Sequence, residues 1–214
     1  MKKTLILADD HVIVSEGIKN LLMQEYEVVA TVENGRDLIT QAKKLNPDVI
    51  VSDVSMPLLN GIDALNKLRE QHVDTKVVFL TMHPDVKYAI RALDAGASGY
   101  VLKNSAADEL LAAVEAALVG RTFITSLLAA EVMEAYRLGG DQKNADPLAL
   151  LSPRQKEVLQ LLAEGRTAKE VANVMNISSR TVEFHKYKII EVLKLDNARE
   201  LVKFAIENGL ATNN

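Results

Sequence analysis

A short apolar run in the first half of the chain, residues 49–51 (VIV), constrains the fold more than any other feature. The run is β-branched, follows a Pro47-Asp48 break and does not alternate with polar residues, which predicts a strand buried on both faces. Asp53 ends this strand. A carboxylate at the carboxyl end of a central parallel strand lies where α/β sheets place their chemistry. Alone, Asp53 is better explained as a helix cap, so its interpretation depends on the rest of the chain.

Four similar runs accompany this one, and helical patterns separate them. The predicted strands span residues 4–8, 27–32, 49–53, 76–81 and 98–103. One helix is expected to begin at Pro84, a favourable first-turn residue, and another to span roughly 106–119. Five βα units imply a parallel sheet with helices on both faces. Right-handed crossovers then give a doubly wound, flavodoxin-like α/β fold, (βα)5.

Polar side chains gather at the carboxyl edge of this predicted sheet. Asp9 and Asp10 follow the first strand, Asp53 ends the third, Thr81 ends the fourth and Lys103 ends the fifth. Clustered carboxylates repel, and a hard divalent cation such as Mg²⁺ compensates them with few protein ligands. One carboxylate can then attack phosphorus. An ammonium and a hydroxyl can hold the equatorial oxygens of a phosphoryl group. The pattern therefore predicts phosphoryl chemistry.

The double aspartate, the D-x-x-M-P motif, Thr81 and the Y-V-L-K motif together resemble the receiver domain of response regulators, over residues 1 to about 122. The resemblance implies that Asp53 accepts a phosphoryl group from a sensor histidine kinase. It implies that Asp10, Asp53 and the Ser55 carbonyl bind the metal, with Asp9 assisting. It also implies that Thr81 and Tyr100 are the switch residues and that Lys103 binds the phosphate. Ser55 and His83 would flank the phosphate and tune its lifetime.

The chain continues into a predicted linker. Residues 125–138 have an apolar stripe at near-helical spacing, which could pack on either domain or on another chain. Residues 139–147 are polar and punctuated by Gly and Pro, typical of a flexible linker. The predicted division is a first domain at 1–122, a linker with a helix at 123–147 and a second domain at 148–214.

The second domain is predicted to be all α-helical. Ser152 caps a helix with Pro153 at its first position, and Thr167 caps a short helix. A tight turn at 176–179 separates the short helix from a longer one, 180–194, which Ser179 would cap. A short helix, a tight turn and a longer helix with a basic face form a helix-turn-helix. A plain helical bundle with a solvated charged face is the alternative.

The amino-acid sequence of this region resembles the DNA-binding domain of the LuxR/NarL family over about 150–212. The resemblance lies in LSPRQKEVL, AKEVANVM and the segment that follows. The whole chain is therefore similar to a NarL/FixJ-type two-component response regulator. The positions carried over as DNA-facing are Arg180, Thr181, Glu183, Lys186, Tyr187 and Lys188. The implied partners are promoter half-sites in double-stranded DNA, RNA polymerase and, on phosphorylation, a second copy of the chain.

A surface for that second copy is suggested by the region of the predicted fourth helix, fifth strand and fifth helix. Charged residues lie there near apolar ones, which suits a reversible contact: Lys87, Arg91, Asp94, Asp108 and Glu109. Once Thr81 bonds the phosphate, space would open for the Tyr100 ring to turn inward and reshape this surface.

The amino-acid composition narrows the class of protein to which the chain can belong. The chain has no cysteine, which excludes disulfide scaffolds and thiolate sites. Residues 148–214 carry 10 basic and 8 acidic residues (+2), and residues 1–147 carry the remaining 15 and 21 (−6), so the two parts suit different partners. No stretch approaches the roughly 18 apolar residues of a membrane span. We expect a cytoplasmic protein that does not contact membranes.

Two alternatives stay open. An enzyme that turns over an aspartyl-phosphate would share the acidic site but would need a substrate pocket and a further acid or base near Asp53. A second alternative keeps DNA binding and makes the first domain a phosphate-independent dimerisation module. The interpretation favoured here is a transcription regulator that is not an enzyme, apart from slow self-dephosphorylation.

Overall fold

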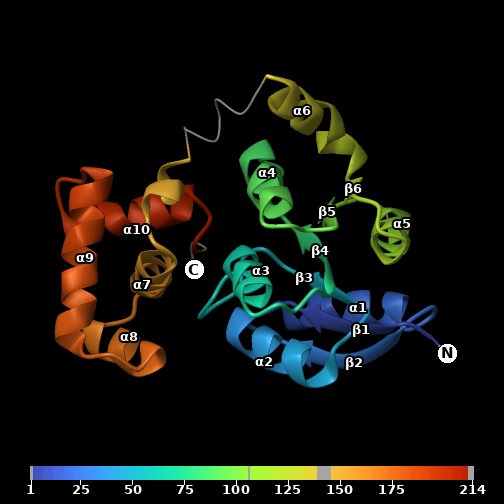
Figure 1. The fold of residues 1–214 in the computed structure, drawn as a ribbon, viewed down its shortest axis with the longest axis horizontal. Helices are drawn as coiled ribbons and strands as arrows, with labels where there is room; N and C mark the ends of the chain where they lie inside the picture. The colour runs from blue at the N-terminus through green and yellow to red at the C-terminus, as the bar shows by residue number, and fades with distance from the viewer. Residues whose placement is uncertain (1, 106, 139–145, 212–214) are drawn as a thin grey trace. The chain divides into compact units, whose positions relative to one another are not determined.

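The computed structural model describes residues 2–105, 107–138 and 146–211 (Figure 1). The chain divides into two compact units, the first holding the sheet with its covering helices and the second holding the C-terminal helices. Of the predicted flexible linker at 139–147, residues 139–145 lie outside the described part. Among the described residues, no helix is long and apolar enough to cross a membrane.

The first unit contains a parallel sheet of six strands in the order β2-β1-β3-β4-β5-β6. The strands are β1 (Thr4–Ala8), β2 (Glu27–Val32), β3 (Val49–Ser52), β4 (Lys76–Thr81), β5 (Gly99–Leu102) and β6 (Phe123–Ile124). The predicted doubly wound α/β fold is confirmed, with the order expected of flavodoxin-like sheets. The two-residue strand β6 was not predicted, and it makes β5 an inner strand.

Helices cover both faces of the sheet, α1 and α5 on one side and α2, α3 and α4 on the other (Figure 1). Their bounds are α1 (Val12–Leu22), α2 (Gly35–Leu45), α3 (Gly61–Glu70), α4 (Val86–Asp94) and α5 (Ala107–Leu118). The prediction that α4 begins at Pro84 is wrong. Asp85 is the N-cap, and its side chain accepts a hydrogen bond from Lys87 N, so the helix begins at Val86.

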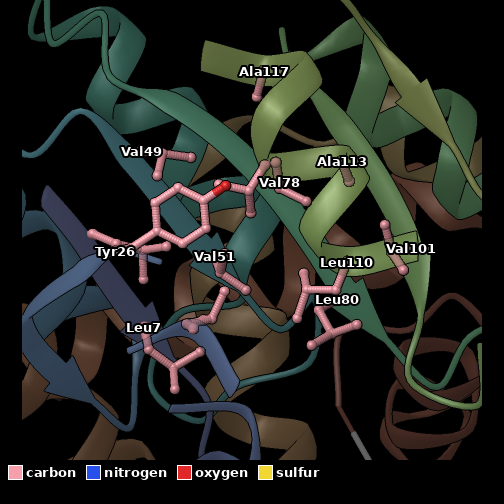
Figure 2. Close-up of a cluster of buried hydrophobic side chains, with 13 residues drawn as sticks. Leu7, Tyr26, Val49, Val51, Val78, Leu80, Val101, Leu110, Ala113 and Ala117 are labelled. Atoms are coloured by element: carbon pink, nitrogen blue, oxygen red, sulfur yellow. The ribbon is translucent and has the colours of Figure 1, made fainter. Parts of the chain in front are cut away.

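Branched apolar side chains of the central strands fill the space between the sheet and α5 (Figure 2). Val51, Val78 and Val101 lie on three neighbouring strands and are at most 1% exposed. Ala113 and Ala117 let α5 approach the sheet closely. The central strands are buried on both faces of the sheet, and this burial fixes where each strand ends. It therefore also fixes the positions of the polar residues that follow the strands.

Helix α6 (Ser126–Arg137) is tied to α5 by one carboxylate. Glu109 accepts hydrogen bonds from Ser126 N (3.1 Å), Ser126 Oγ (2.8 Å) and Thr125 Oγ1. Burial alone would raise the pKa of Glu109, but these hydrogen bonds outweigh it and lower the pKa to about 2. Glu109, which the sequence placed on a reversible contact surface, is thus already engaged in holding the start of α6. Leu128 and Val132 form the buried side of that helix.

The second unit is helical throughout its described elements. These are the 3-10 helix η2 (Pro147–Leu150), α7 (Pro153–Ala163), α8 (Ala168–Met175), α9 (Ser179–Leu193) and α10 (Ala198–Glu207). Capping boxes at Ser152 and Thr167 start α7 and α8 as predicted. Helix α9 begins one residue earlier than predicted because Ser178, not Ser179, accepts the capping hydrogen bond from Thr181 N. The fold class of this domain is confirmed.

Candidate functional site

Five of the polar side chains picked out by the sequence lie together at the carboxyl edge of the sheet. Asp9, Asp53 and Lys103 each come directly after a strand, and Thr81 is the last residue of β4. The main chain fixes two of them, because Asp53 N donates to Ala8 O (2.7 Å) and Asp9 N donates to Val32 O (2.9 Å). Asp9 and Asp53 are 2% and 4% exposed, so two carboxylates are held largely out of water.

Helix α3 approaches the end of β3 so closely that only glycine fits at its first position. A Cβ on Gly61 would lie 2.2 Å from Asp53 O and 2.8 Å from Phe79 Cε1. Asn60 caps this helix, and Gly61 N donates to Val54 O (2.8 Å). The Asn60-Gly61 pair therefore sets the path of the main chain around Asp53.

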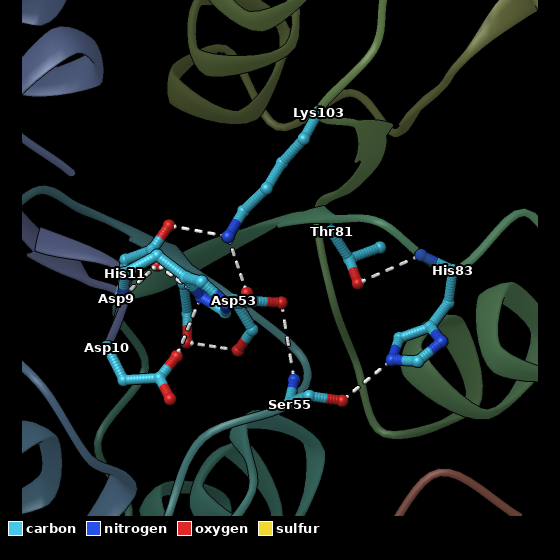
Figure 3. Close-up of polar contacts among 9 residues, drawn as sticks. Asp9, Asp10, His11, Asp53, Ser55, Thr81, His83 and Lys103 are labelled. Atoms are coloured by element: carbon cyan, nitrogen blue, oxygen red, sulfur yellow. Dashed lines mark hydrogen bonds and ion pairs between the residues drawn. The ribbon is translucent and has the colours of Figure 1, made fainter. Parts of the chain in front are cut away.

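Lys103 bridges the two buried carboxylates (Figure 3). Its Nζ lies 2.7 Å from Asp9 Oδ2 and 2.5 Å from Asp53 Oδ2. Burial alone would lower the pKa of Lys103, but the two carboxylates outweigh it and raise the pKa. The raised pKa favours the charged ammonium, which points at one carboxylate oxygen of Asp53.

The opposite side of the site is acidic and offers ligands for a cation. Among the described residues, Asp9, Asp10, His11 and Asp53 each offer one donor atom, and these atoms lie within 4.8 Å of one another. Burial, with smaller contributions from Asp53 and Asp9, raises the pKa of Asp10. Asp10 Oδ1 is buried and lies 3.0 Å from His11 Nδ1. This donor set fits a hard divalent cation such as Mg²⁺.

Thr81 and Tyr100 both contact the main chain of His83. Thr81 Oγ1 accepts from His83 N (3.3 Å), and Tyr100 Oη donates to His83 O (2.9 Å). Tyr100 is 0% exposed, so in this structure the ring is already inward, and burial raises the pKa of its hydroxyl. The sequence-based prediction is that the Tyr100 ring turns inward on phosphorylation, whereas in this structure the ring is already buried.

Two further side chains line the loop beyond Asp53. Ser55 N donates to Asp53 Oδ1 (3.2 Å), and Ser55 Oγ lies 2.7 Å from His83 Nε2. The His83 ring stacks on Tyr88 with centroids 4.7 Å apart. Burial lowers the pKa of His83, which favours the neutral imidazole. Both residues lie beside Asp53, as the sequence suggested.

Helix α9 presents a second candidate site, on its solvent-facing side. Its buried side is formed by Val182 and Ile189. Arg180, Tyr187 and Lys188 are exposed on the other side, with Tyr187 66% exposed. The remaining predicted DNA-facing residues, Thr181, Glu183 and Lys186, are partly buried on the flanks of the helix. Lys186 Nζ lies 3.2 Å from Glu183 Oε2, so these two charges pair with each other.

Sequence reasoning missed Phe184, which is 59% exposed. It lies two residues after the buried Val182, about 200° around the helix, and so at the centre of the outward face. There the ring contacts the edge of the His185 ring, with centroids 5.8 Å apart. The helical spacing carried the signal, because Phe184 lies opposite the buried stripe of the helix.

Comparisons with known proteins identify the family of each unit. Residues 5–115 match the family model of the response regulator receiver domain, and residues 149–205 match that of the bacterial regulatory proteins of the luxR family. The chain is 35% identical to the oxygen regulatory protein NreC of Staphylococcus epidermidis, with 96% of this chain and 98% of that protein covered. It is 33% identical to the transcriptional regulatory protein DegU of Brevibacillus brevis, with 97% and 94% covered.

A solved structure described as two RcsB dimers bound to two parallel DNAs superposes with a TM-score of 0.60 at 28% identity, covering 97% of this chain and 99% of that one. The receiver match alone spans more than half of the chain, and the relatives match it from end to end. The chain therefore belongs to the two-component response regulators that join a receiver domain to a LuxR-type DNA-binding domain and regulate transcription.

Proposed function

We propose that a sensor histidine kinase phosphorylates Asp53 and that phosphorylation promotes dimerisation and promoter binding. The observation that supports this proposal is the environment of Asp53, which follows the central strand. Lys103 Nζ donates to one of its carboxylate oxygens and Ser55 N donates to the other. Asp9 and Asp10 come from a different strand end and face the same point. The acid that ends β3 is thus better placed as the acceptor than its two neighbours.

In the proposed transfer, a carboxylate oxygen of Asp53 attacks the phosphorus atom of a phosphohistidine on the kinase. A new P–O bond forms, the P–N bond breaks, and the imidazole leaves with the bonding electrons. Lys103 stabilises the charge on the phosphoryl oxygens, since its ammonium already contacts Asp53. Thr81 supplies a hydroxyl to the same oxygens.

The proposed metal ligands are Asp10, Asp53 and the carbonyl of Ser55, with Asp9 assisting. When bound, Mg²⁺ would neutralise the carboxylates and the phosphoryl charge. The donor atoms of Asp9, Asp10 and Asp53 lie within 4.8 Å of one another, which supports this assignment.

Coupling to the surface would run through His83. Thr81 Oγ1 accepts from His83 N, and a rotation of its side chain to donate to a phosphate would change that contact. Tyr100 Oη donates to His83 O, so the two proposed switch residues both contact the main chain of His83, in the loop before α4. A shift of that loop would change the surface of α4 and β5, where we propose that a second copy binds. A few kcal/mol suffices to change the dominant population.

The DNA partner would be read by α9. Arg180, Tyr187 and Lys188 are proposed as the central contacts, with Thr181, Glu183 and Lys186 on the flanks. Lys186 and Lys188 would each need to leave an acid of the same helix, Glu183 or Glu191, to reach a phosphate. Dimers would place two such helices on half-sites about one helical turn apart. The DNA-bound RcsB dimers support this arrangement, RNA polymerase is a further proposed partner, and a DNA-binding role favours the cytoplasm.

We propose the domain division stated from the sequence, 1–122, 123–147 and 148–214, with β6 and the start of α6 docked on the first domain. We further propose that the chain is not an enzyme beyond slow loss of its own phosphate. Ser55 and His83 would set that lifetime, because their side chains contact each other beside Asp53. Replacing either by alanine is expected to change the half-life of the phosphorylated state.

The direct test is phosphorylation by a small-molecule phosphodonor with Mg²⁺, followed by intact-mass measurement. Wild type should gain one phosphoryl group and Asp53→Asn none. Asp74→Asn, which replaces an exposed acid in the loop between α3 and β4, serves as the control and should be phosphorylated normally. Phosphate retained on Asp53→Asn would refute the assignment.

A further inference from the structure

The imidazole of His83 is contacted from two directions. At its edge, Nε2 lies 2.7 Å from Ser55 Oγ. On its face, the ring stacks on Tyr88 of α4, with centroids 4.7 Å apart and ring planes at 22°. Tyr88 is 8% exposed, and neither the proposed transfer nor the proposed switch gives it a role. A buried aromatic ring thus supports a side chain that lies beside Asp53.

The main chain of His83 is held as well. His83 N donates to Thr81 Oγ1 (3.3 Å), and His83 O accepts from Tyr100 Oη (2.9 Å). With the backbone held in this way, the freedom left to the residue is rotation of its side chain. The stacked ring of Tyr88 restricts that rotation, because the contact is favourable only while the two rings stay face to face.

Helix α4 in turn keeps Tyr88 in place. Asp85 caps the helix by accepting from Lys87 N (2.8 Å), and Tyr88 N donates to Asp85 O (3.1 Å). The guanidinium carbon of Arg91, three residues further along the helix, lies 5.8 Å from the centroid of the Tyr88 ring. A cation over an aromatic ring is attracted to it. The ring on which His83 stacks is therefore itself fixed.

The pair formed by Ser55 and His83 closes one side of the receiver site. Figure 3 shows this pair on the side of Asp53 away from Asp10. Ser55 follows β3 and His83 follows β4, so the pair joins two loops. At 2.7 Å, Ser55 Oγ and His83 Nε2 are bonded directly, which leaves no space for a water molecule between them. Each side chain also uses a hydrogen-bonding group on the other instead of on a water.

We propose that Tyr88 is a positioning residue, which holds the His83 imidazole against Ser55 and thereby lengthens the lifetime of the phosphoryl group on Asp53. This inference rests on the proposed phosphorylation of Asp53 and deepens it. It adds a residue that touches neither Asp53 nor the phosphoryl group and acts through His83 alone.

The step that the pair slows is hydrolysis of the aspartyl phosphate. A water oxygen attacks phosphorus in line with the bond to the Asp53 oxygen. A new P–O bond to that water forms, the P–O bond to Asp53 breaks, and the carboxylate leaves with the bonding electrons while the water loses a proton to solvent. When the His83 ring turns away from Ser55, the two loops separate and water reaches the phosphorus atom more easily.

The rival explanation is that Tyr88 only fills space beneath α4. A residue of that kind would act through the stability of the helix, whether or not an imidazole is present at position 83. A positioning residue acts only through the imidazole. The two explanations therefore differ in a variant that lacks both side chains.

The test phosphorylates the full-length chain with a small-molecule phosphodonor and Mg²⁺, removes the donor and follows loss of the phosphoryl group by intact mass. His83→Ala should shorten the half-life about threefold, because one hydrogen bond of the closed pair is lost. Tyr88→Leu, which keeps an apolar side chain but loses the stack, should also shorten it about threefold. Tyr88→Phe keeps the stack and should match wild type.

The double variant decides between the two explanations. His83→Ala combined with Tyr88→Leu should have the half-life of His83→Ala alone, whereas independent effects would multiply to about ninefold. Ala89→Gly is the control for a weakened helix, because it removes a buried methyl group at the next position of α4 and lowers helix propensity. Its half-life should match wild type. Multiplying effects, or a shortening in Ala89→Gly equal to that in Tyr88→Leu, would overturn the inference.

Nuclear magnetic resonance gives a second readout, on the unphosphorylated chain. The ring protons of His83, identified by their absence in His83→Ala, should be shifted upfield by the stacked ring in wild type and in Tyr88→Phe. Tyr88→Leu should lose that shift. An unchanged shift in Tyr88→Leu would show that Tyr88 does not hold the imidazole.

The same experiment separates this inference from the proposed function. If wild type is phosphorylated on Asp53 and Tyr88→Leu loses its phosphoryl group at the wild-type rate, only the role of Tyr88 fails. A longer half-life in His83→Ala or Tyr88→Leu would also overturn the inference while leaving phosphorylation of Asp53 intact. If wild type takes up no phosphoryl group, the proposed function fails, and the inference fails with it.

Discussion

The receiver site and the DNA-facing helix use side chains in opposite ways. Asp53 and Lys103 are nearly excluded from water, come from different strands and contact each other at 2.5 Å. Phe184 and Tyr187 are more than half exposed and come from one helix, where we propose that DNA covers them. Function in the first site therefore depends on the packing of the whole sheet. Function in the second depends on one helical face, so its side chains should be replaceable one at a time.

The largest effect is expected from Gly61→Ala. The added Cβ would meet Asp53 O at 2.2 Å, so α3 or the end of β3 must move. We expect a loss of about 1–3 kcal/mol in the free energy of unfolding together with slower phosphorylation. Gly17→Ala is the matched control, because nothing lies within 4 Å of its Cβ. That exposed position in α1 should gain about 0.5–1 kcal/mol. Equal effects of the two substitutions in chemical denaturation would contradict the packing argument.

Lys103→Arg tests whether charge alone is enough at the buried site. The Lys103 side chain is 5% exposed and bridges two carboxylates, so the wider guanidinium cannot take the same position. Phosphorylated Lys103→Arg should lose most of a phosphate-induced gain in DNA affinity of about tenfold.

The companion substitution, Lys188→Arg, keeps charge on an exposed position and should leave DNA affinity within about twofold. Fluorescence anisotropy on one promoter duplex measures both variants. Similar losses in the two would remove the contrast between the sites.

Phe184→Ala should relax sequence preference without changing the dependence of binding on salt. An exposed ring on this face can contact a thymine methyl group, and one such contact is worth about 1 kcal/mol of discrimination. Lys188→Ala should instead lower the slope of log K against log salt by about one, because it removes a phosphate contact. Binding measured on matched duplexes at several salt concentrations separates the two. A changed slope in Phe184→Ala would mean that the ring supports the helix rather than reads a base.

The smallest effect concerns Glu109, whose pKa is lowered from 4.5 to about 2 by its hydrogen bonds. A lowered pKa in the folded state stabilises the fold above the unfolded pKa and loses that contribution as pH falls through the folded value. The stability difference between wild type and Glu109→Gln should therefore shrink as pH falls from 4.5 toward 2. Urea unfolding across this range measures it, with Asp108→Asn as the control for loss of one exposed negative charge. A difference that does not vary with pH would show that α6 is held by packing alone.

Much of the first unit could be predicted because burial leaves a strong imprint on sequence. Continuous β-branched runs such as 49–51 reveal strands covered on both faces, and the residue after each run identifies the edge where Asp9, Asp53 and Lys103 meet. The strand β6 could not be found in this way, because its two residues pair only through β5. Element ends were missed by one or two residues where a side-chain cap, Asp85 or Ser178, decided them.

The missed functional residues share a physical reason. Phe184 is apolar, and a helical pattern does not distinguish an apolar residue for the core from one for a partner. In the sequence, Glu109 is one of several charged residues on the predicted surface. In the structure, β6 places Thr125 and Ser126 within hydrogen-bond distance of it. Each depends on contacts between segments that the sequence pattern does not encode.

The central claim is that the state of Asp53 in one unit sets the DNA affinity of the other. It is tested most directly by measuring the affinity of one promoter duplex for the full-length chain before and after treatment with a small phosphodonor and Mg²⁺. The account predicts that wild type binds about tenfold more tightly after treatment, with a shift toward dimer in sedimentation, and that Asp53→Asn shows neither change. Equal affinities for treated and untreated wild type, with phosphorylation confirmed by mass, would contradict it.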